Sequence, residues 1–298
     1  MTNVPELPAV GTRVSLRYRL PAGSVPPMSD VVGHLLEVGP TLRVKTKAGD
    51  VVTIAVADVV SLRPLSAAPV RNRDIRNLEH AAALAWPGVE QLWLGGWLLR
   101  FGHGVTRRAN SAVPLLPTPG EHVGEITDWY AARGVPPLLA VPDRLAHVPP
   151  GQPTDGENIV MTRRLTAETV APSVTLTVEP DDEWLSLHPR KVPVDVLTAV
   201  VDGEVVFGRV AGAAVGRGAV TVAPDGTHWA GLSSVHVVED ARRRGVARSL
   251  CDALLAWAVE RGATRAYVQV LSDNVAATKL YESMGFSEHH RSRYVSLR

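Results

Sequence analysis

A short basic turn between a predicted strand and a predicted helix carries the residues with the clearest chemical potential. The strand covers 233–238, where β-branched apolar residues dominate, and from Val246 onward apolar residues recur at helical spacing. Three arginines at 242–244 and then Gly245 form the turn. The first amides of a helix lack intrahelical partners and carry partial positive charge, and glycine lets a ligand approach the backbone closely. We therefore expect the amides of 243–248 to bind an anion such as a diphosphate, with the guanidinium groups adding full charges.

The spacing within this turn resembles a motif of a known superfamily. Arg242-x-x-Gly245-x-Ala247 after a strand is similar to the acyl-CoA pyrophosphate loop of the GCN5-related N-acetyltransferases, the GNAT superfamily. That loop reads Gln/Arg-x-x-Gly-x-Gly/Ala, and an ordinary solvated helix start would also satisfy so short a pattern. A second, independent segment therefore has to decide between the two interpretations.

That second segment begins at Asn274 and reads Asn-x-x-Ala-x-x-Leu-Tyr-x-x-x-Gly-Phe. It resembles the second acyl-CoA segment of the same superfamily. A predicted helix over 244–261 and a predicted strand over 266–271 separate the two motifs, in the order that the superfamily has them. The resemblance implies an α+β fold, the GNAT fold, in which helices flank a mixed central sheet.

The second motif lies on a predicted helix over 274–284. Ser272 or Asp273 is expected to cap it, and Gly285 to end it in a left-handed conformation. Asn274 and Tyr281 are two helical turns apart, so the two side chains should project from nearly the same side.

The resemblance also implies an activity: direct transfer of an acetyl group from the co-substrate acetyl-CoA to an amine, without a metal. By the resemblance, the pantetheine arm lies along the strand at Val235 and Val237, Asn274 bonds the arm, and Tyr281 protonates the departing CoA thiolate. A strand amide can stabilise the oxyanion. The expected cofactor-binding residues are Val235, His236, Val237, Arg242, Arg243, Arg244, Gly245, Val246, Ala247, Arg248, Asn274 and Tyr281.

The general base departs from the superfamily pattern. Many GNAT enzymes carry Glu five residues before the motif asparagine, and this chain has Gln269 there. An alkylammonium has a pKa near 10, so some group must still remove its proton. The candidates are His228, His236, Glu239 or a relaying water.

The sequence leaves the acceptor and one alternative function open. A protein lysine such as one in a histone-like tail, a protein N-terminus and a small amine all remain possible acceptors. The alternative is a CoA-binding regulatory pseudoenzyme whose N-terminal barrel docks a partner. A third hypothesis tethers the enzyme to nucleic acid through that barrel.

Composition narrows the class of protein. The chain has 298 residues with a net charge of +1, which gives no support for a large nucleic-acid-binding surface. Cys251, the only cysteine, excludes an intramolecular disulfide and is expected to be a buried small hydrophobe. We see no secretory signal and no membrane span, because charged residues interrupt the most apolar region at 197–223. A cytoplasmic location is expected.

Residues 1–66 predict a small all-β module that looks like an SH3-like barrel. Strands are expected over 11–20, 31–38, 41–47 and 51–56, joined by glycine turns, and the segment 57–63 is expected to end the module. The basic residues on these strands are interpreted as solvated strand faces, because no aromatic stacking set accompanies them. They are Arg13, Arg17, Arg19, Arg43, Lys45 and Lys47.

A linker at 64–69 precedes a middle lobe, 71–170, that resembles a degenerate GNAT half without the acyl-CoA loop. Its expected helices begin at Asp74, as a cap, and at Glu121. Its expected strands cover 92–100, kinked at two glycines, as well as 107–113, 137–141 and 159–165.

Residues 171–298 are expected to form the catalytic domain. A strand over 174–179 and a short helix capped by Asp181 come first, followed by strands over 196–201, 205–210 and 218–222. A hairpin over 288–297 is expected to close the chain.

Overall fold

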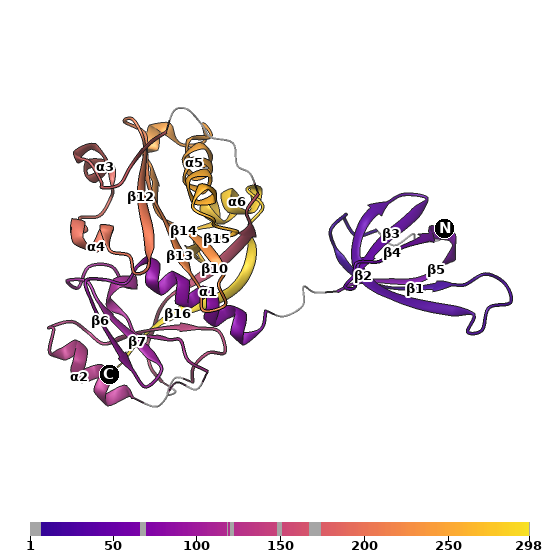
Figure 1. Ribbon diagram of the computed structural model, residues 1–298, viewed down its shortest axis with the longest axis horizontal. Helices are drawn as coiled ribbons and strands as arrows, with labels where there is room; N and C mark the ends of the chain where they lie inside the picture. Colours follow the sequence, from indigo (N-terminus) through magenta and orange to yellow (C-terminus); the bar gives the residue numbers. More distant parts are fainter. Residues whose placement is uncertain are drawn as a thin grey trace. The chain divides into compact units, whose positions relative to one another are not determined.

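The computed structural model describes residues 7–65, 70–117, 119, 122–147, 151–166 and 174–297. The chain divides into two compact units, residues 1–69 and 70–298, each described here by itself (Figure 1). Most of the predicted linker at 64–69, and Glu121, at which a helix was expected to begin, lie outside the described residues.

The first unit is a five-stranded antiparallel barrel-like sheet in the order β4-β3-β2-β1-β5, which confirms the predicted small barrel. Side chains alternate in burial along the strands, so that Val14, Leu16, Leu42 and Val44 form the core. The strands are β1 Arg13–Arg19, β2 Met28–Val38, β3 Thr41–Thr46, β4 Val51–Ala55 and β5 Val59–Pro64, with a short 3-10 turn, η1 Val56–Asp58.

Acidic partners accompany part of the basic surface of this barrel. Arg17 donates two hydrogen bonds of 2.9 Å to Asp30 on the neighbouring strand, and Arg43 lies 3.5 Å from Glu37. These exposed pairs are what solvated strand faces contain.

The second unit is built on an eight-stranded mixed sheet in the order β11-β12-β13-β14-β15-β10-β16-β9. Only β14 and β15 are parallel neighbours. The strands are β9 Leu138–Pro142, β10 Thr154–Arg164, β11 Thr175–Thr177, β12 Gly203–Val210, β13 Ala214–Val222, β14 His228–Val237, β15 Arg265–Leu271 and β16 Ser287–Ser296.

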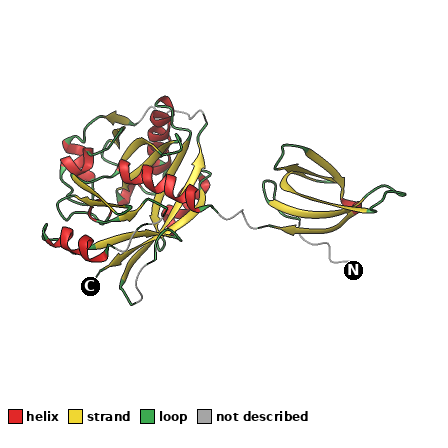
Figure 2. Ribbon diagram, turned by 60° about the horizontal axis from the view of Figure 1, so that its bottom comes forward, coloured by secondary structure: helices red, strands yellow, loops and turns green. Residues whose placement is uncertain are grey.

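Helices cover both faces of this sheet (Figures 1 and 2). The face that carries Leu232 and Val268 packs on α5 Val246–Glu260 and α6 Val275–Ser283. The opposite face, which carries Trp229 and Tyr267, packs on α1 Asn72–Ala85. The alternation of strand side chains thus separates an α5 face from an α1 face.

The remaining elements form a small sheet and short helices. They are β6 Glu90–Leu94, β7 Trp97–Phe101 and β8 Val113–Pro114, the 3-10 turns η2 Arg108–Asn110 and η3 Glu239–Ala241, and the helices α2 Val123–Ala131, α3 Asp182–Leu187 and α4 Val194–Thr198.

Two expectations for the middle lobe are wrong. The single kinked strand over 92–100 is two strands, β6 and β7, because Gly95 and Gly96 both take positive φ and make a hairpin turn. Of the strand expected over 107–113, residues 108–110 form η2 and only Val113 belongs to a strand, β8, since the side chain of Asn110 bonds the backbone around Gly102 and turns the chain.

Two later expectations are also wrong. Residues 194–198 form α4 instead of a strand, and the carbonyls of Leu197 and Ala199 accept hydrogen bonds from buried Arg217 at 2.7 and 2.9 Å. The hairpin over 288–297 is one strand, β16, paired with β10 on one side and β9 on the other.

Helix caps follow the prediction in one case out of three. Asp181 caps α3 by accepting from the amide of Trp184 at 2.8 Å, as expected. The helix α1 begins at Asn72 with no side-chain cap, and α6 is capped by Asn274, not by Ser272 or Asp273.

A boundary near residue 170 between two domains stays a prediction. In the second unit, β10 from the middle lobe lies between β15 and β16 from the C-terminal part of the chain. The middle lobe and the C-terminal part of the chain therefore contribute strands to the same sheet and side chains to the same hydrophobic core.

Candidate active site

The parallel strands β14 and β15 form a fork. They pair from Trp229 opposite Arg265 to Leu232 opposite Val268, and no pairing follows beyond that position among the described residues. A bulge opposite Gly216 then bends β14, with Ser234 at a φ of 54°. The end of β14 consequently stays bonded to β13, while its other edge is available to an extended ligand.

Ser233 follows the last paired position of the fork. Its hydroxyl oxygen is buried and has no hydrogen-bond partner within the described part of the chain. A buried hydroxyl without a partner costs free energy, so a ligand in the fork that bonds it would recover that cost.

The basic turn leads from β14 into α5. Gly245 is the N-cap, with a φ of 81°, and a Cβ added there would meet nothing within 4 Å. Arg243 also has a positive φ, 60°. For the amides of 243–248 we find no hydrogen-bond partner in the residues that the structure describes, and the first turn of α5 carries no acidic residue. This open concavity of main-chain donors fits a diphosphate.

The four arginines of the turn are exposed, and two of them support the backbone. Arg242 donates to the carbonyl of Val237 at 3.2 Å, which ties the turn to the end of β14. Arg248 donates to the carbonyl and hydroxyl of Ser283 at 3.0 and 2.7 Å, which ties α5 to α6. Because Arg248 uses Nη2 for both bonds, its other nitrogens remain available for an anion.

Asn274 serves as the cap of α6. Its side-chain oxygen accepts from the amide of Ala277 at 3.1 Å, and the residue is exposed. The amide nitrogen of the side chain can still donate to a ligand. The expectation that Asn274 and Tyr281 project from nearly the same side is wrong, because Asn274 lies at the surface and the side chain of Tyr281 lies in the core.

Tyr281 packs in the core between α5 and α6, with 6% of its surface exposed. Its ring contacts that of Phe286 edge-on, and its hydroxyl interacts with the thiol of Cys251. Burial, followed by the Cys251 thiol, raises the pKa of Tyr281 well above 10, so the phenol keeps its proton at neutral pH. A general acid must meet that condition.

Cys251 is fully buried, as expected. Burial raises the pKa of its thiol to about 12, so the group stays neutral and is not a nucleophile at physiological pH.

The three candidate bases differ in position. His228 opens β14, and its carbonyl accepts from the amide of Thr264, so it lies at the opposite end of the strand from the basic turn. His236 is half-buried in the bulged end of β14, and burial followed by Arg242 lowers its pKa. Glu239 is exposed in η3. None of the three lines the polar pocket described next.

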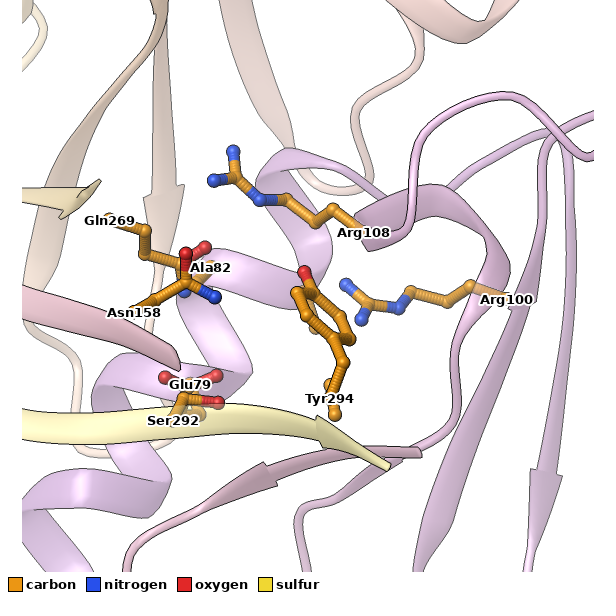
Figure 3. A pocket seen from close by; sticks show the side chains of 10 residues that line it. Glu79, Ala82, Arg100, Arg108, Asn158, Gln269, Ser292 and Tyr294 are labelled. Atoms are coloured by element: carbon orange, nitrogen blue, oxygen red, sulfur yellow. The ribbon is translucent and has the colours of Figure 1, made fainter. Parts of the chain in front are cut away.

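A polar pocket lies on the α1 face of the sheet (Figure 3). Gln269, the residue after the last paired position of β15, lines it together with residues from α1, β7, η2, β9, β10 and β16. The other lining residues are Glu79, Ala82, Ala83, Arg100, Arg108, Ala140, Asn158, Ser292 and Tyr294.

Glu79, which lines this pocket, forms a buried ion pair or hydrogen bond with His290. Glu79 Oε1 lies 2.8 Å from His290 Nε2, and the two side chains are 6% and 1% exposed. His289 Nδ1 lies 2.8 Å from His290 Nδ1. Burial, followed by the contact with His290, lowers the pKa of His289 to about 4, so His289 is neutral at pH 7.

The pocket residues Glu79 and Arg100, and His290 bonded to Glu79, were not among the residues predicted from the sequence. One signal existed: Glu79 falls on the same helical stripe as Ile75, Leu78 and Ala82, where a charge is unexpected.

The family comparisons agree with this geometry. A family model described as "Probable histone acetyltransferase Rv0428c C-terminal" matches residues 72–295, and one described as "Rv0428c N-terminal Sm-like domain" matches residues 8–63. The chain belongs to this family. The SH3-like barrel expected from the strand order is, by the second description, an Sm-like small barrel.

Two curated relatives carry acetyltransferase names. One is "Probable histone acetyltransferase Rv0428c" of Mycobacterium tuberculosis, 51% identical over 97% of this chain and 95% of the relative. The other, "Uncharacterized N-acetyltransferase YobR" of Bacillus subtilis, is 27% identical over 73% of this chain and 97% of the relative. Neither name supports the pseudoenzyme alternative.

Solved structures show the same fold. A GCN5-related N-acetyltransferase from Kribbella flavida aligns with a TM-score of 0.54 at 16% identity, over 74% of this chain and 94% of its own. A putative acetyltransferase of the GNAT family from Novosphingobium aromaticivorans aligns with a TM-score of 0.53 at 20% identity, over 72% and 95%. The chain is therefore a GNAT-type N-acetyltransferase, and enzymes with this fold use acetyl-CoA.

In the described ranges, no group of three or more His, Cys, Asp or Glu side chains could hold a metal ion. No helix of that same part of the chain is long and apolar enough to cross a membrane.

Proposed function

We propose that this N-acetyltransferase moves the acetyl group of acetyl-CoA to the amine of a protein lysine side chain, as in a histone-like tail. Support for this acceptor comes from the mycobacterial relative named a probable histone acetyltransferase, which is 51% identical. A small amine remains the second candidate, because the polar pocket is small and carries charges of both signs.

One observation carries the proposal. The fork between β14 and β15 has the open basic turn of 242–248 at one end and the polar pocket, through Gln269, on its α1 face. An acyl donor held by the turn and a nucleophile held in the pocket could therefore meet at the fork.

The cofactor-binding roles follow from the donors that are free. The amides of 243–248 bind the diphosphate, and the guanidinium groups around Gly245 neutralise it. The edge of β14 at Val235 and Val237 bonds the pantetheine arm as an added strand would, through groups other than the Val237 carbonyl, which accepts from Arg242. Asn274 donates its side-chain amide to the arm while its oxygen caps α6.

The chemical roles belong to groups near the fork. Acetyl-CoA supplies an activated thioester carbonyl. A main-chain amide near Val235 stabilises the oxyanion that forms on attack. Tyr281 protonates the leaving thiolate, which requires the hydroxyl to turn from Cys251 toward the sulfur, and the raised pKa of Tyr281 keeps it protonated for that task.

A transfer assay with labelled acetyl-CoA tests the proposed function. The full chain is offered a lysine-rich histone H3-type tail peptide with a blocked N-terminus, the same peptide with every lysine replaced by arginine, and spermidine as a small amine. Label on the lysine peptide and none on the arginine peptide is the expected result. Label only on spermidine would replace the lysine acceptor by a small amine, and label on neither would overturn both acceptors.

A further inference from the structure

A proton acceptor is missing at the usual position in this active site. Gln269 cannot accept the proton of an ammonium group, yet a lysine amine with a pKa near 10.4 must become neutral before it can attack. A carboxylate placed elsewhere in the same pocket would supply that function.

The strand register shows where such a group could lie. Gln269 pairs with Val160 on β10, and Val160 pairs with His290 on β16. Directly paired residues share a face, so Gln269 and His290 both point to the α1 face in one row across three strands. At about 4.8 Å between neighbouring strands, the two backbones are about 10 Å apart, within the span of one pocket.

Glu79 lies on α1, the helix that covers this face of the sheet, and its side chain points toward the row formed by Gln269, Val160 and His290. Its carboxylate reaches His290 Nε2 at 2.8 Å and lines the same pocket as Gln269 and Asn158. Figure 3 shows these side chains converging from α1, β10 and β15. The carboxylate that many GNAT enzymes carry on the strand is, in this chain, available from the helix above it.

The hydrogen bonds around His290 define its role. With His289 neutral, its Nδ1–H donates to His290 Nδ1, and His290 Nε2–H donates to Glu79. These tautomers are inferred from the network. The arrangement presents one Glu79 oxygen to His290, and among the described residues we find no hydrogen-bond partner for the other, which can accept a proton.

We propose that Glu79 is the general base of the acetyl transfer and that His290 is the residue that positions it; this rests on the proposed function. The acceptor ammonium gives one proton to the free Glu79 oxygen, and the nitrogen lone pair forms the C–N bond to the acetyl carbon. The C–S bond breaks, and the CoA thiolate takes a proton from Tyr281. The nitrogen loses its second proton as the amide forms, which restores Tyr281, so the net products are amide, CoA thiol and one proton.

The charged and titratable groups around Glu79 come from four elements. They are Arg100 on β7, Arg108 on η2, Tyr267 on β15, and His289, His290 and Tyr294 on β16.

The test measures kcat/KM for the full chain with acetyl-CoA and the lysine peptide between pH 7.0 and 9.5. Glu79→Gln keeps the shape and can still accept from His290. We expect about a 100-fold loss at pH 7, the lower range for general base catalysis. The loss should shrink as pH approaches the pKa of the free amine, because a neutral amine needs no base.

Controls separate this role from a structural one. Glu204→Gln, which removes an exposed carboxylate bonded to Arg261, should leave kcat/KM unchanged. Gln269→Glu added to Glu79→Gln should recover part of the rate. Calorimetric acetyl-CoA affinity should be the same in wild type and Glu79→Gln.

Two outcomes would overturn the proposal: wild-type kcat/KM in Glu79→Gln, or a loss that is constant with pH. If Glu79→Gln does not fold, Glu79→Asp replaces it, because aspartate keeps the negative charge but holds the carboxylate one methylene farther from the acceptor. Full activity in Glu79→Asp would equally overturn the proposal. Absence of transfer by the wild type would defeat the proposed function itself, whereas transfer that is indifferent to Glu79 would defeat only this inference.

Discussion

The two sides of the β14–β15 fork use different chemistry. The basic turn of 242–248 is exposed and offers main-chain amides from consecutive residues. The polar pocket is lined by side chains from segments up to about two hundred residues apart, including Glu79 and Gln269. The first arrangement suits a ligand part that is the same in every reaction, and the second suits an acceptor that differs between enzymes.

This difference also predicts how the two sides of the fork tolerate amino-acid substitutions. A main-chain cradle loses function only where its backbone or its charge is disturbed. A buried polar network loses function when any one partner is removed, because the remaining partner is left unsatisfied. Substitutions on the two sides should therefore fail in different ways.

The largest effect is expected from Gly245→Glu on the exposed side. An acidic side chain at the centre of the cradle repels the diphosphate, and like-charge contacts cost several kcal/mol, or about 1000-fold in affinity. Gly245→Asn, which tolerates the observed φ of 81°, is the matched control and should bind nearly as wild type. Calorimetry measures the affinity of both variants for acetyl-CoA. Equal affinities in Gly245→Glu and Gly245→Asn would show that the amides around Gly245 do not bind the diphosphate.

Tyr281→Phe should have the next largest effect. Loss of the acid is expected to lower kcat by about 100-fold while the acetyl-CoA affinity stays the same. Because the folded pKa of Tyr281 is raised, its protonated form persists, and wild-type kcat should show no alkaline decline from this group below about pH 10. Wild-type turnover in the variant would return Tyr281 to a purely structural role.

Acid should destabilise the pocket side through His289. Its folded pKa of about 4 lies below the value of about 6.5 in an unfolded chain, so the unfolded chain binds the proton first. The stability is fully present above about pH 6.5 and is lost as pH falls toward 4, by about 2 kcal/mol at pH 5.

Urea unfolding followed by tryptophan fluorescence measures this loss. All seven tryptophans belong to residues 70–298, so the signal reports the second unit of the full chain. His289→Gln should flatten the slope between pH 7 and 5, and a slope equal to that of the wild type would contradict the assignment.

The smallest effect is expected at Asn274, where two functions can be separated. Asn274→Ala removes the cap of α6 and should cost about 1 kcal/mol of stability. Asn274→Asp keeps the cap but lacks the amide donor, so it should retain stability and bind acetyl-CoA several-fold more weakly. Equal affinity in wild type and Asn274→Asp would show that the side-chain amide does not touch the cofactor.

Local patterns in the sequence were sufficient for one side of the fork. The turn at Gly245, the strand before it and α5 after it are determined by residues close in sequence, through glycine conformation and hydrophobic period. The alternation in residues 13–64 likewise predicted the barrel, because each strand pairs with a neighbour across a short connection, apart from the closing β1–β5 pair.

Expectations failed where distant contacts override local preference. Residues 194–198 form a helix whose C-terminal end is held by buried Arg217, which donates to the carbonyls of Leu197 and Ala199. β16 stays one strand because β10 and β9 bond both of its edges. Tyr281 and Asn274 are two turns apart in sequence, yet Cys251 and Ala277 draw their side chains into different surroundings.

By itself, the sequence determined the small N-terminal barrel and the position of the basic turn, because each depends on short-range spacing and backbone freedom, and its two motifs resembled those of the GNAT superfamily. Only the tertiary structure decided that Glu79 and Gln269 share a pocket and that His290 bonds Glu79, since that depends on the order of strands in the sheet and on the helix that crosses them. A buried carboxylate among alanines is ambiguous in sequence, and it gains a chemical meaning only when its neighbours in space are known.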